Sequence, residues 1–158
     1  MYKERYKTMI DRFERFSIAI AEASRYWHKL ATEELGKYGL RGSHAMYLTT
    51  MYRYPDGITV PRLCELCGKD KSDASRMIGI LEEKGLVTKK EVDGSLYRGL
   101  LVLTPEGSEA AKHVSERACR VVELVADDLT DENREIFYES LSTITLKLRE
   151  LTDNGIPD

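Results

Sequence analysis

The sequence predicts a mainly α-helical protein with one small β-hairpin, an α+β fold of short helices flanked by longer ones. Long stretches repeat their apolar residues at spacings of three and four, and an Asp93-Gly94 turn dipeptide joins two β-rich segments. A chain of 158 residues is long enough to bury a core of its own. We therefore expect a small folded domain with helical arms.

Long helices with an apolar seam are expected near both ends of the chain. Residues 9–35, 105–127 and 131–152 each alternate apolar spacings of three and four. This period is typical of helices that pack along other helices. We expect a dimer interface that includes Phe13, Phe16, Ile20, Leu141, Ile144 and Leu148.

The middle of the chain predicts shorter helices with local capping signals. Ser43 is a candidate N-cap for the second helix, which ends before the turn at residues 55–57. Thr59 is expected to cap a helix that ends at Cys67, and Asp70 is expected to cap the next one. Two helices joined by such a tight turn form a helix-turn-helix.

Two predicted strands, 86–92 and 96–103, follow these helices. Three short helices and a hairpin in this order are typical of a winged helix-turn-helix, in which the hairpin is the wing and one helix enters the major groove. We assign residues 43–104 to a winged helix-turn-helix DNA-binding domain. Residues 1–42 and 105–158 are assigned to a helical dimerisation region.

Three motifs carry a family resemblance. Residues 70–87 read Asp-Lys-Ser-Asp-Ala-Ser-Arg-Met-Ile-Gly-Ile-Leu-Glu-Glu-Lys-Gly-Leu-Val, residues 103–107 read Leu-Thr-Pro-Glu-Gly, and residues 129–132 read Leu-Thr-Asp-Glu. In this order and spacing they resemble the MarR (multiple-antibiotic-resistance regulator) family. The resemblance implies a cytoplasmic homodimeric regulator, most often a repressor. Such a regulator binds pseudo-palindromic double-stranded operator DNA and releases it when a small molecule binds or a cysteine is oxidised.

The start of the predicted recognition helix, residues 70–84, offers groups that can contact DNA. The Arg76 guanidinium can donate to both acceptors of a guanine edge, and lysines neutralise phosphate. Asp73 stands where the family more often has a neutral residue, so it either caps the helix or accepts from a cytosine amino group. The predicted DNA contacts are Lys69, Lys71, Ser72, Asp73, Ser75 and Arg76, with Lys89, Lys90 and Arg98 from the wing.

An effector site is expected where the first two helices meet. Aromatic residues concentrate there, and the family resemblance places the effector pocket at this junction. A pocket lined by aromatic side chains and a few polar groups suits a small aromatic or phenolic ligand, although aromatic side chains also occur in ordinary hydrophobic cores. The predicted effector residues are Tyr26, Trp27, His44 and Tyr47.

The charge of the chain is unevenly distributed. The formal net charge is −3, but residues 1–68 are net +3 and residues 127–158 are net −6. A phosphate-facing surface in the first hundred residues is therefore compatible with the acidic total. An alternative stays open, a winged-helix protein-interaction module that does not bind DNA. It is favoured by the acidic net charge, by Asp73 and by a wing tip with one arginine.

The cysteines leave a second alternative, a redox-responsive regulator or thiol enzyme. Cys64 and Cys67 form a CxxC pair, but no second pair completes a zinc site, so we favour a packing role for both. Three cysteines without a secretory signal favour the reducing cytoplasm. We expect no enzyme, no cofactor and no metal. No apolar run approaches the ~20 residues of a membrane span.

Overall fold

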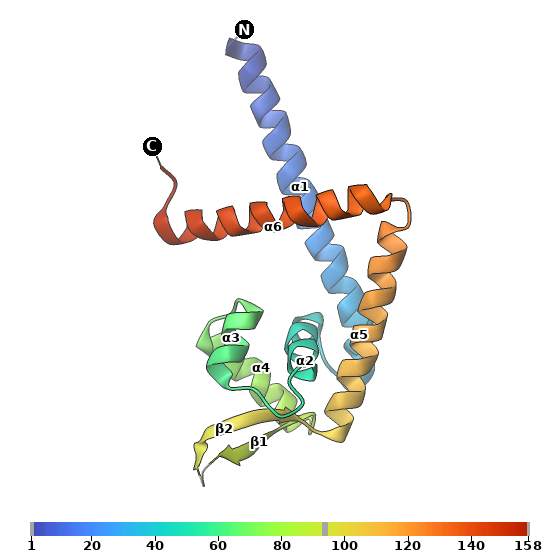
Figure 1. Ribbon diagram of the computed structural model, residues 1–158, viewed down its shortest axis with the longest axis vertical. Helices are drawn as coiled ribbons and strands as arrows, with labels where there is room; N and C mark the ends of the chain where they lie inside the picture. The colour runs from blue at the N-terminus through green and yellow to red at the C-terminus, as the bar shows by residue number, and fades with distance from the viewer. Residues whose placement is uncertain (1, 93–94, 158) are drawn as a thin grey trace. The chain divides into compact units, whose positions relative to one another are not determined.

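The computed structural model describes residues 2–92 and 95–157, with side chains over residues 8–90 and 99–157. The chain divides into two compact units, Met1–Ala118 and Cys119–Asp158, which are described separately. Helices dominate both units, and the described residues contain one two-stranded antiparallel sheet. The predicted fold class, mainly helical with a hairpin wing, is confirmed (Figure 1).

The elements follow one another in the predicted order. In the first unit they are α1 (Tyr2–Leu35), two 3-10 turns (Gly36–Tyr38 and Gly42–His44), α2 (Ala45–Tyr52), α3 (Val60–Cys67), α4 (Lys71–Glu83), β1 (Val87–Val92), β2 (Ser95–Leu103) and the start of α5 (Pro105–Ala126). The second unit holds the end of α5 and all of α6 (Asp131–Asn154).

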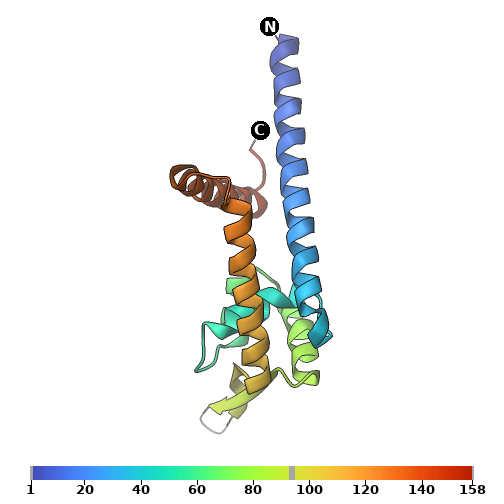
Figure 2. The same cartoon turned by 90° about the vertical axis from the view of Figure 1, so that its right-hand side faces the viewer.

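The first helix is longer than the apolar seam predicts. It begins at Tyr2 rather than at residue 9. The apolar seam marks only the positions that pack against a partner, whereas Lys3, Glu4 and Arg5 belong to residue types with a high intrinsic helix propensity. Figure 2 shows the first half of α1 extending beyond the other elements of the first unit.

Side-chain caps define the helix-turn-helix. Thr59 Oγ1 accepts from the Arg62 amide at 3.4 Å, and Asp70 Oδ1 accepts from the Asp73 amide at 2.8 Å, so both predicted caps are confirmed. Between the two helices Gly68 adopts a left-handed conformation, φ +60°, which glycine adopts without a Cβ penalty. This turn fixes the start of α4.

The expected cap at Ser43 is wrong. Residues Gly42–His44 form a 3-10 turn, and α2 begins at Ala45 without a side-chain cap. The turn is held against α1, because the Gly42 amide donates to Thr32 Oγ1 at 2.9 Å. That tertiary contact replaces the local cap.

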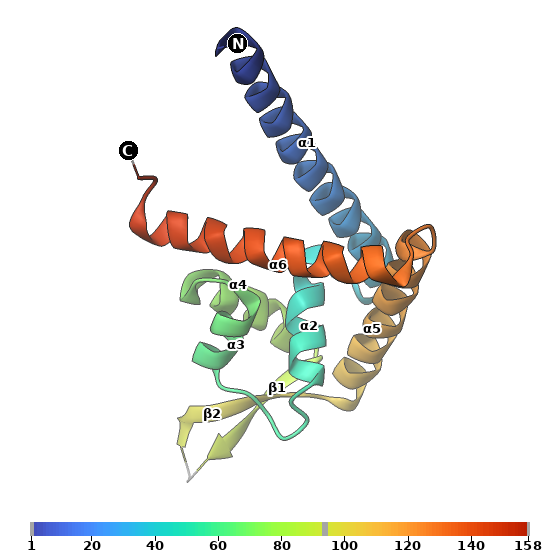
Figure 3. The ribbon, with the colours of Figure 1, turned by 45° about the horizontal axis from the view of Figure 1, so that its top comes forward.

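The wing is tied to the helices beside it. In the hairpin Val87 pairs with Leu103 and Lys89 with Leu101. Ile58, just before α3, exchanges two 2.9 Å backbone hydrogen bonds with Leu101. Figure 3 shows α2, α3 and α4 gathered beside the hairpin. The largest fully buried side chains of this core are Tyr47, Leu35, Leu48, Met51, Leu63, Leu81 and Leu101.

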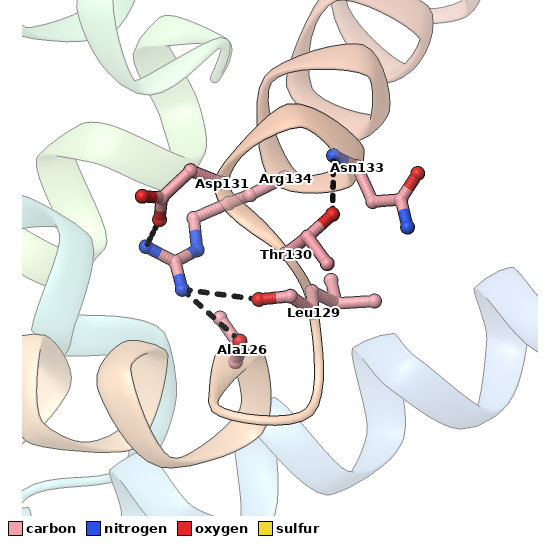
Figure 4. A network of polar contacts seen from close by, with 6 residues as sticks. All are labelled: Ala126, Leu129, Thr130, Asp131, Asn133 and Arg134. Atoms are coloured by element: carbon pink, nitrogen blue, oxygen red, sulfur yellow. Dashed lines mark hydrogen bonds and ion pairs between the residues drawn. The ribbon is translucent and has the colours of Figure 1, made fainter.

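In the second unit, one arginine closes the corner between α5 and α6 (Figure 4). Arg134 donates to the Ala126 carbonyl at 3.2 Å and to the Leu129 carbonyl at 3.5 Å, and it pairs with Asp131 at 3.3 Å. Thr130 caps α6 as predicted. The Ala126 carbonyl also accepts from the Leu129 amide at 3.0 Å, so the guanidinium adds a second donor to the end of α5 and ties it to the first turn of α6.

Candidate nucleic-acid interface

Helix α4 has a buried face and an exposed face. The buried residues are those predicted from the apolar spacing, Ala74, Met77, Ile78 and Leu81. The exposed residues are the predicted DNA contacts Lys71, Ser72, Ser75 and Arg76, with Lys69 just before the helix. Because the core fixes one side of α4, the other side presents a polar and basic surface of defined orientation.

Asp73 lies at the edge of this surface and contacts residues on both sides. Arg76 donates to Asp73 Oδ1 at 2.7 Å, and the Tyr47 hydroxyl, from α2, donates to Asp73 Oδ2 at 3.0 Å. The Arg76 side chain is 69% exposed and that of Asp73 is 25% exposed. The Asp73 amide is the one that Asp70 caps. Asp73 is therefore held through its backbone and through both carboxylate oxygens.

These contacts set the charges of the pair. The hydrogen bond from Arg76, followed by that from Tyr47, lowers the pKa of the Asp73 carboxyl below its usual value. Burial, reinforced by the bond to Asp73, raises the pKa of the Tyr47 hydroxyl. At neutral pH Asp73 is an anion and Tyr47 a neutral donor.

A shallow open hollow of about 320 Å³ lies on the same surface. Its lining residues are Asp70, Ser72, Asp73 and Arg76. Pockets for aromatic ligands are lined mainly by apolar side chains, whereas this hollow is lined by polar and charged groups. Its chemistry suits contact with another polar surface.

The wing contributes two described lysines. Lys89 and Lys90 are exposed on β1. Lys89 Nζ lies 3.3 Å from Glu82 Oε1, so one wing cation is paired with the end of α4. The side chain of Arg98 and the tip residues Asp93 and Gly94 lie outside the described residues.

The four predicted effector residues lie in two different environments. Tyr26 and Trp27 are 54% and 47% exposed on α1, whereas His44 and Tyr47 are buried. His44 Nδ1 accepts from the Arg41 amide at 3.2 Å, and its Nε2 is buried without a hydrogen-bond partner among the described residues. Burial lowers the pKa of His44, so the neutral imidazole is favoured.

All three cysteines are free. Cys67 is buried, with Sγ 3.7 Å from Thr50 Oγ1, and Cys64 is half-buried on the same helix. Burial raises the pKa of the Cys67 thiol, which disfavours the reactive thiolate. Cys119, in the second unit, is exposed.

Two contacts between distant segments were not visible in the sequence. One is the hydrogen bond from Tyr47 to Asp73, and the other joins Glu34 of α1 to His113 and Arg117 of α5, at 3.0 and 2.7 Å. Periodicity and capping rules describe neighbours along one helix. A pair formed between helices needs the fold, and no local signal marks these residues.

The described residues contain no group of three or more His, Cys, Asp or Glu side chains that could hold a metal. None of the described helices combines the length and the apolar character that a membrane crossing requires.

Comparison with known proteins finds the family that the sequence motifs resemble. A model of the MarR family matches residues 38–95. No curated protein matches the chain in sequence.

Solved structures share the fold over most of the chain. A complex of S. aureus MepR with DNA is 17% identical, with a TM-score of 0.76 over 84% of this chain and 96% of that chain. A MarR transcriptional regulator from Methanosarcina mazei Go1 is 21% identical, with a TM-score of 0.73 over 87% and 99%.

A MarR family regulator from Listeria monocytogenes, in complex with a 26mer DNA, is 19% identical, with a TM-score of 0.75 over 89% and 95% of the two chains. At these identities the likeness to solved structures shows the fold. The family model over residues 38–95 and this shared fold together confirm that the chain resembles the MarR family.

Proposed function

We propose that the chain is a homodimeric transcription regulator that represses by occupying a pseudo-palindromic operator. The observation that carries this proposal is α4, whose buried face fixes an exposed face of Ser72, Ser75 and Arg76. A helix held in this way can present its first turns to a major groove. The S. aureus and Listeria proteins with this fold were solved bound to DNA.

Each basic residue has a distinct role in this proposal. Arg76 reads a guanine edge, because the planar guanidinium matches the two acceptors O6 and N7. Lys69, Lys71 and the wing lysine Lys90 neutralise phosphates, which strengthens binding to any sequence. Lys89 also neutralises a phosphate, once its ion pair with Glu82 is broken.

The dimer part of the proposal rests on apolar residues that one chain leaves exposed. The members of the predicted interface, each at least 37% exposed, are Phe13, Phe16, Ile20, Leu141, Ile144 and Leu148. Large exposed apolar surfaces mark interaction sites, and obligate dimers bury more than ~2,000 Å². A second copy of the chain is the partner that a twofold operator requires.

The decisive experiment is DNA selection followed by titration. Genomic fragments bound by the pure protein define the operator, and anisotropy titrations at several salt concentrations then measure its affinity. We expect Arg76→Ala to weaken operator binding by about 1–3 kcal/mol per half-site and to reduce the sequence specificity at one base pair. Arg149→Ala, which removes the same charge from α6, is the control and should bind as wild type. Salt-independent binding, or no selected fragments, would favour the protein-interaction module.

The effector part of the proposal rests on the junction of α1 with the turn before α2. Tyr26 and Trp27 offer exposed rings, and the buried Nε2 of His44 has an unused hydrogen-bonding capacity among the described residues. We propose that a small aromatic or phenolic effector binds there and releases DNA. Tyr47 is left out of this set, since its hydroxyl is engaged by Asp73.

A fluorescence titration tests the effector. Trp27 is the single tryptophan, so binding of phenol or benzoate beside it should quench the emission. To weaken DNA binding a hundredfold, the effector must bind the conformer that does not hold DNA more tightly than the DNA-binding conformer, by ~2.7 kcal/mol. His44→Ala should raise the effector concentration needed for release without changing operator affinity. An unchanged dose-response curve would remove His44 from the site.

A further inference from the structure

A chain of hydrogen bonds joins the buried core to the exposed face of α4. Tyr47 on α2, which is 1% exposed, donates to one oxygen of Asp73, and Arg76 donates to the other. We infer that Tyr47 and Asp73 are positioning residues that hold Arg76 for reading a base, so that Tyr47 determines specificity without touching DNA. This inference rests on the proposed DNA-binding function.

The geometry fixes Asp73 more firmly than an ordinary surface acid. Its amide donates to the Asp70 cap at 2.8 Å, and its Oδ2 accepts from Tyr47 at 3.0 Å. The side chain of Tyr47 is enclosed by the core, so its hydroxyl has a defined position. The carboxylate plane is therefore set from the core side, and Oδ1 is presented to Arg76.

Arg76 gains orientation from this arrangement. An exposed arginine has many rotamers, and ordering them on binding opposes association. One N–H of Arg76 is engaged by Asp73 at 2.7 Å. A guanidinium carries five N–H donors, so the remaining donors can still reach the two acceptors of a guanine. The anchored side chain is then limited to bases within a narrow range of positions.

The charge of Asp73 has a separate and opposite effect. An anion beside the phosphate backbone opposes binding to every sequence, because phosphate contacts dominate non-specific affinity. Asp73 therefore lowers non-specific binding while it orients Arg76. Tyr47 is neutral, so removing its hydroxyl changes the orientation alone. The two residues can thus be separated experimentally.

An exposed arginine–carboxylate pair three residues apart contributes little to stability. A purely structural role for Tyr47–Asp73, joining α2 to α4, would change affinity for all duplexes by the same factor. A positioning role would change the ratio between the operator and an operator altered at the base pair that Arg76 reads. That ratio is the quantity to measure.

The experiment uses the full-length protein and three duplexes: the selected operator, the operator altered at the base pair relaxed by Arg76→Ala, and an unrelated sequence. The variants are Tyr47→Phe, Asp73→Asn, Arg76→Ala and the double variant Tyr47→Phe/Arg76→Ala. The controls are Tyr52→Phe, which removes an exposed hydroxyl from the same helix α2, and Glu83→Gln, which removes an acid from the other end of α4.

We expect Tyr47→Phe to reduce discrimination at that base pair threefold to tenfold, with wild-type affinity and salt slope on the unrelated duplex. Asp73→Asn should show the same loss of discrimination and bind the unrelated duplex more tightly. The double variant should discriminate no worse than Arg76→Ala alone, because Tyr47 acts through Arg76. Both controls should behave as wild type.

If Tyr47→Phe and Asp73→Asn discriminate between the operator and the altered operator as well as wild type does, while Arg76→Ala does not, the inference is overturned and the proposed function stands. Equal weakening of all three duplexes by Tyr47→Phe would also overturn it and leave a structural contact only. Absence of salt-dependent DNA binding by the wild type would instead reject the proposed function, and the inference with it. Asp73→Asn lies at the surface, so the test survives if Tyr47→Phe folds poorly.

Discussion

A backbone contact between α5 and the start of the wing makes Gly107 sensitive to a single methyl group. A Cβ added at position 107 would lie 1.8 Å from the Leu86 carbonyl oxygen and 2.8 Å from its carbon. Leu86 O also accepts from the Thr104 amide at 3.0 Å, and Thr104 Oγ1 accepts from the Gly107 amide at 3.0 Å. Because the obstructing atoms are backbone, relief requires α5 to move away from Leu86.

The size of the effect follows from these contacts. Overpacking a dense site destabilises by about 1–3 kcal/mol and occasionally more, and rigid backbone obstruction places Gly107→Ala at the upper end. Displacing the turn also weakens the cap at Thr104, which is worth about 1 kcal/mol. We expect a total loss of about 3–4 kcal/mol from the free energy of unfolding.

Gly79→Ala is the matched control. Apart from its chain neighbours and the backbone of α4 itself, no heavy atom lies within 4 Å of the position that its added methyl group would take. The same substitution inside α4 should therefore stabilise by about 0.5–1 kcal/mol through helix propensity. Urea unfolding followed by circular dichroism, at one protein concentration, compares the three proteins. A midpoint for Gly107→Ala equal to or above that of wild type would refute the packing argument.

Three further predictions concern charge and assembly. Lys90→Ala should weaken binding to all duplexes about equally. It should also reduce by ~1 the slope of the logarithm of the binding constant against the logarithm of the salt concentration, because one phosphate contact is lost. An effect confined to one sequence would contradict a phosphate role. The hydrogen bond from Arg117 lowers the pKa of Glu34, so its contribution to stability is present above the unfolded pKa of about 4.3 and is lost as pH falls through the lower folded pKa. Acid titration of stability should therefore be shallower in Glu34→Gln than in wild type below about pH 5, and superimposable curves would contradict the pairing. Deletion of residues 131–158 should yield unfolded or aggregated protein, and a folded monomer, seen by sedimentation, would argue against α6 as an interface.

The order of the elements and the buried face of α4 could be predicted because they depend on local signals. Apolar spacing located Ala74 and Leu81 in the core, and side-chain chemistry located the caps at Thr59 and Asp70. Ser43 failed as a cap, because a contact from α1 decides how that segment turns.

The candidate site was only partly predictable for the same reason. Helix position and residue type predict that Arg76 and Ser72 lie on the exposed face of α4, and both are exposed there. The sequence predicts Tyr47 as a residue of the effector site, and it gives no sign that the Tyr47 hydroxyl contacts a carboxylate 26 positions further along the chain. The sequence also marked Asp73 as a departure from the family pattern, but its role depends on which side chains the fold brings to its two oxygens.

None of the described residues of α6 is buried, so under the proposed dimer the order of this helix depends on the concentration of the chain. A helix that buries nothing within its own chain gains little from tertiary packing, which supplies most helical stability. If the partner surface comes from a second copy, mass action makes α6 most ordered when copies are abundant. Under the proposed dimer, an unpaired chain exposes α6, and we expect a protease to cleave this helix more readily in the dilute protein than in the concentrated protein.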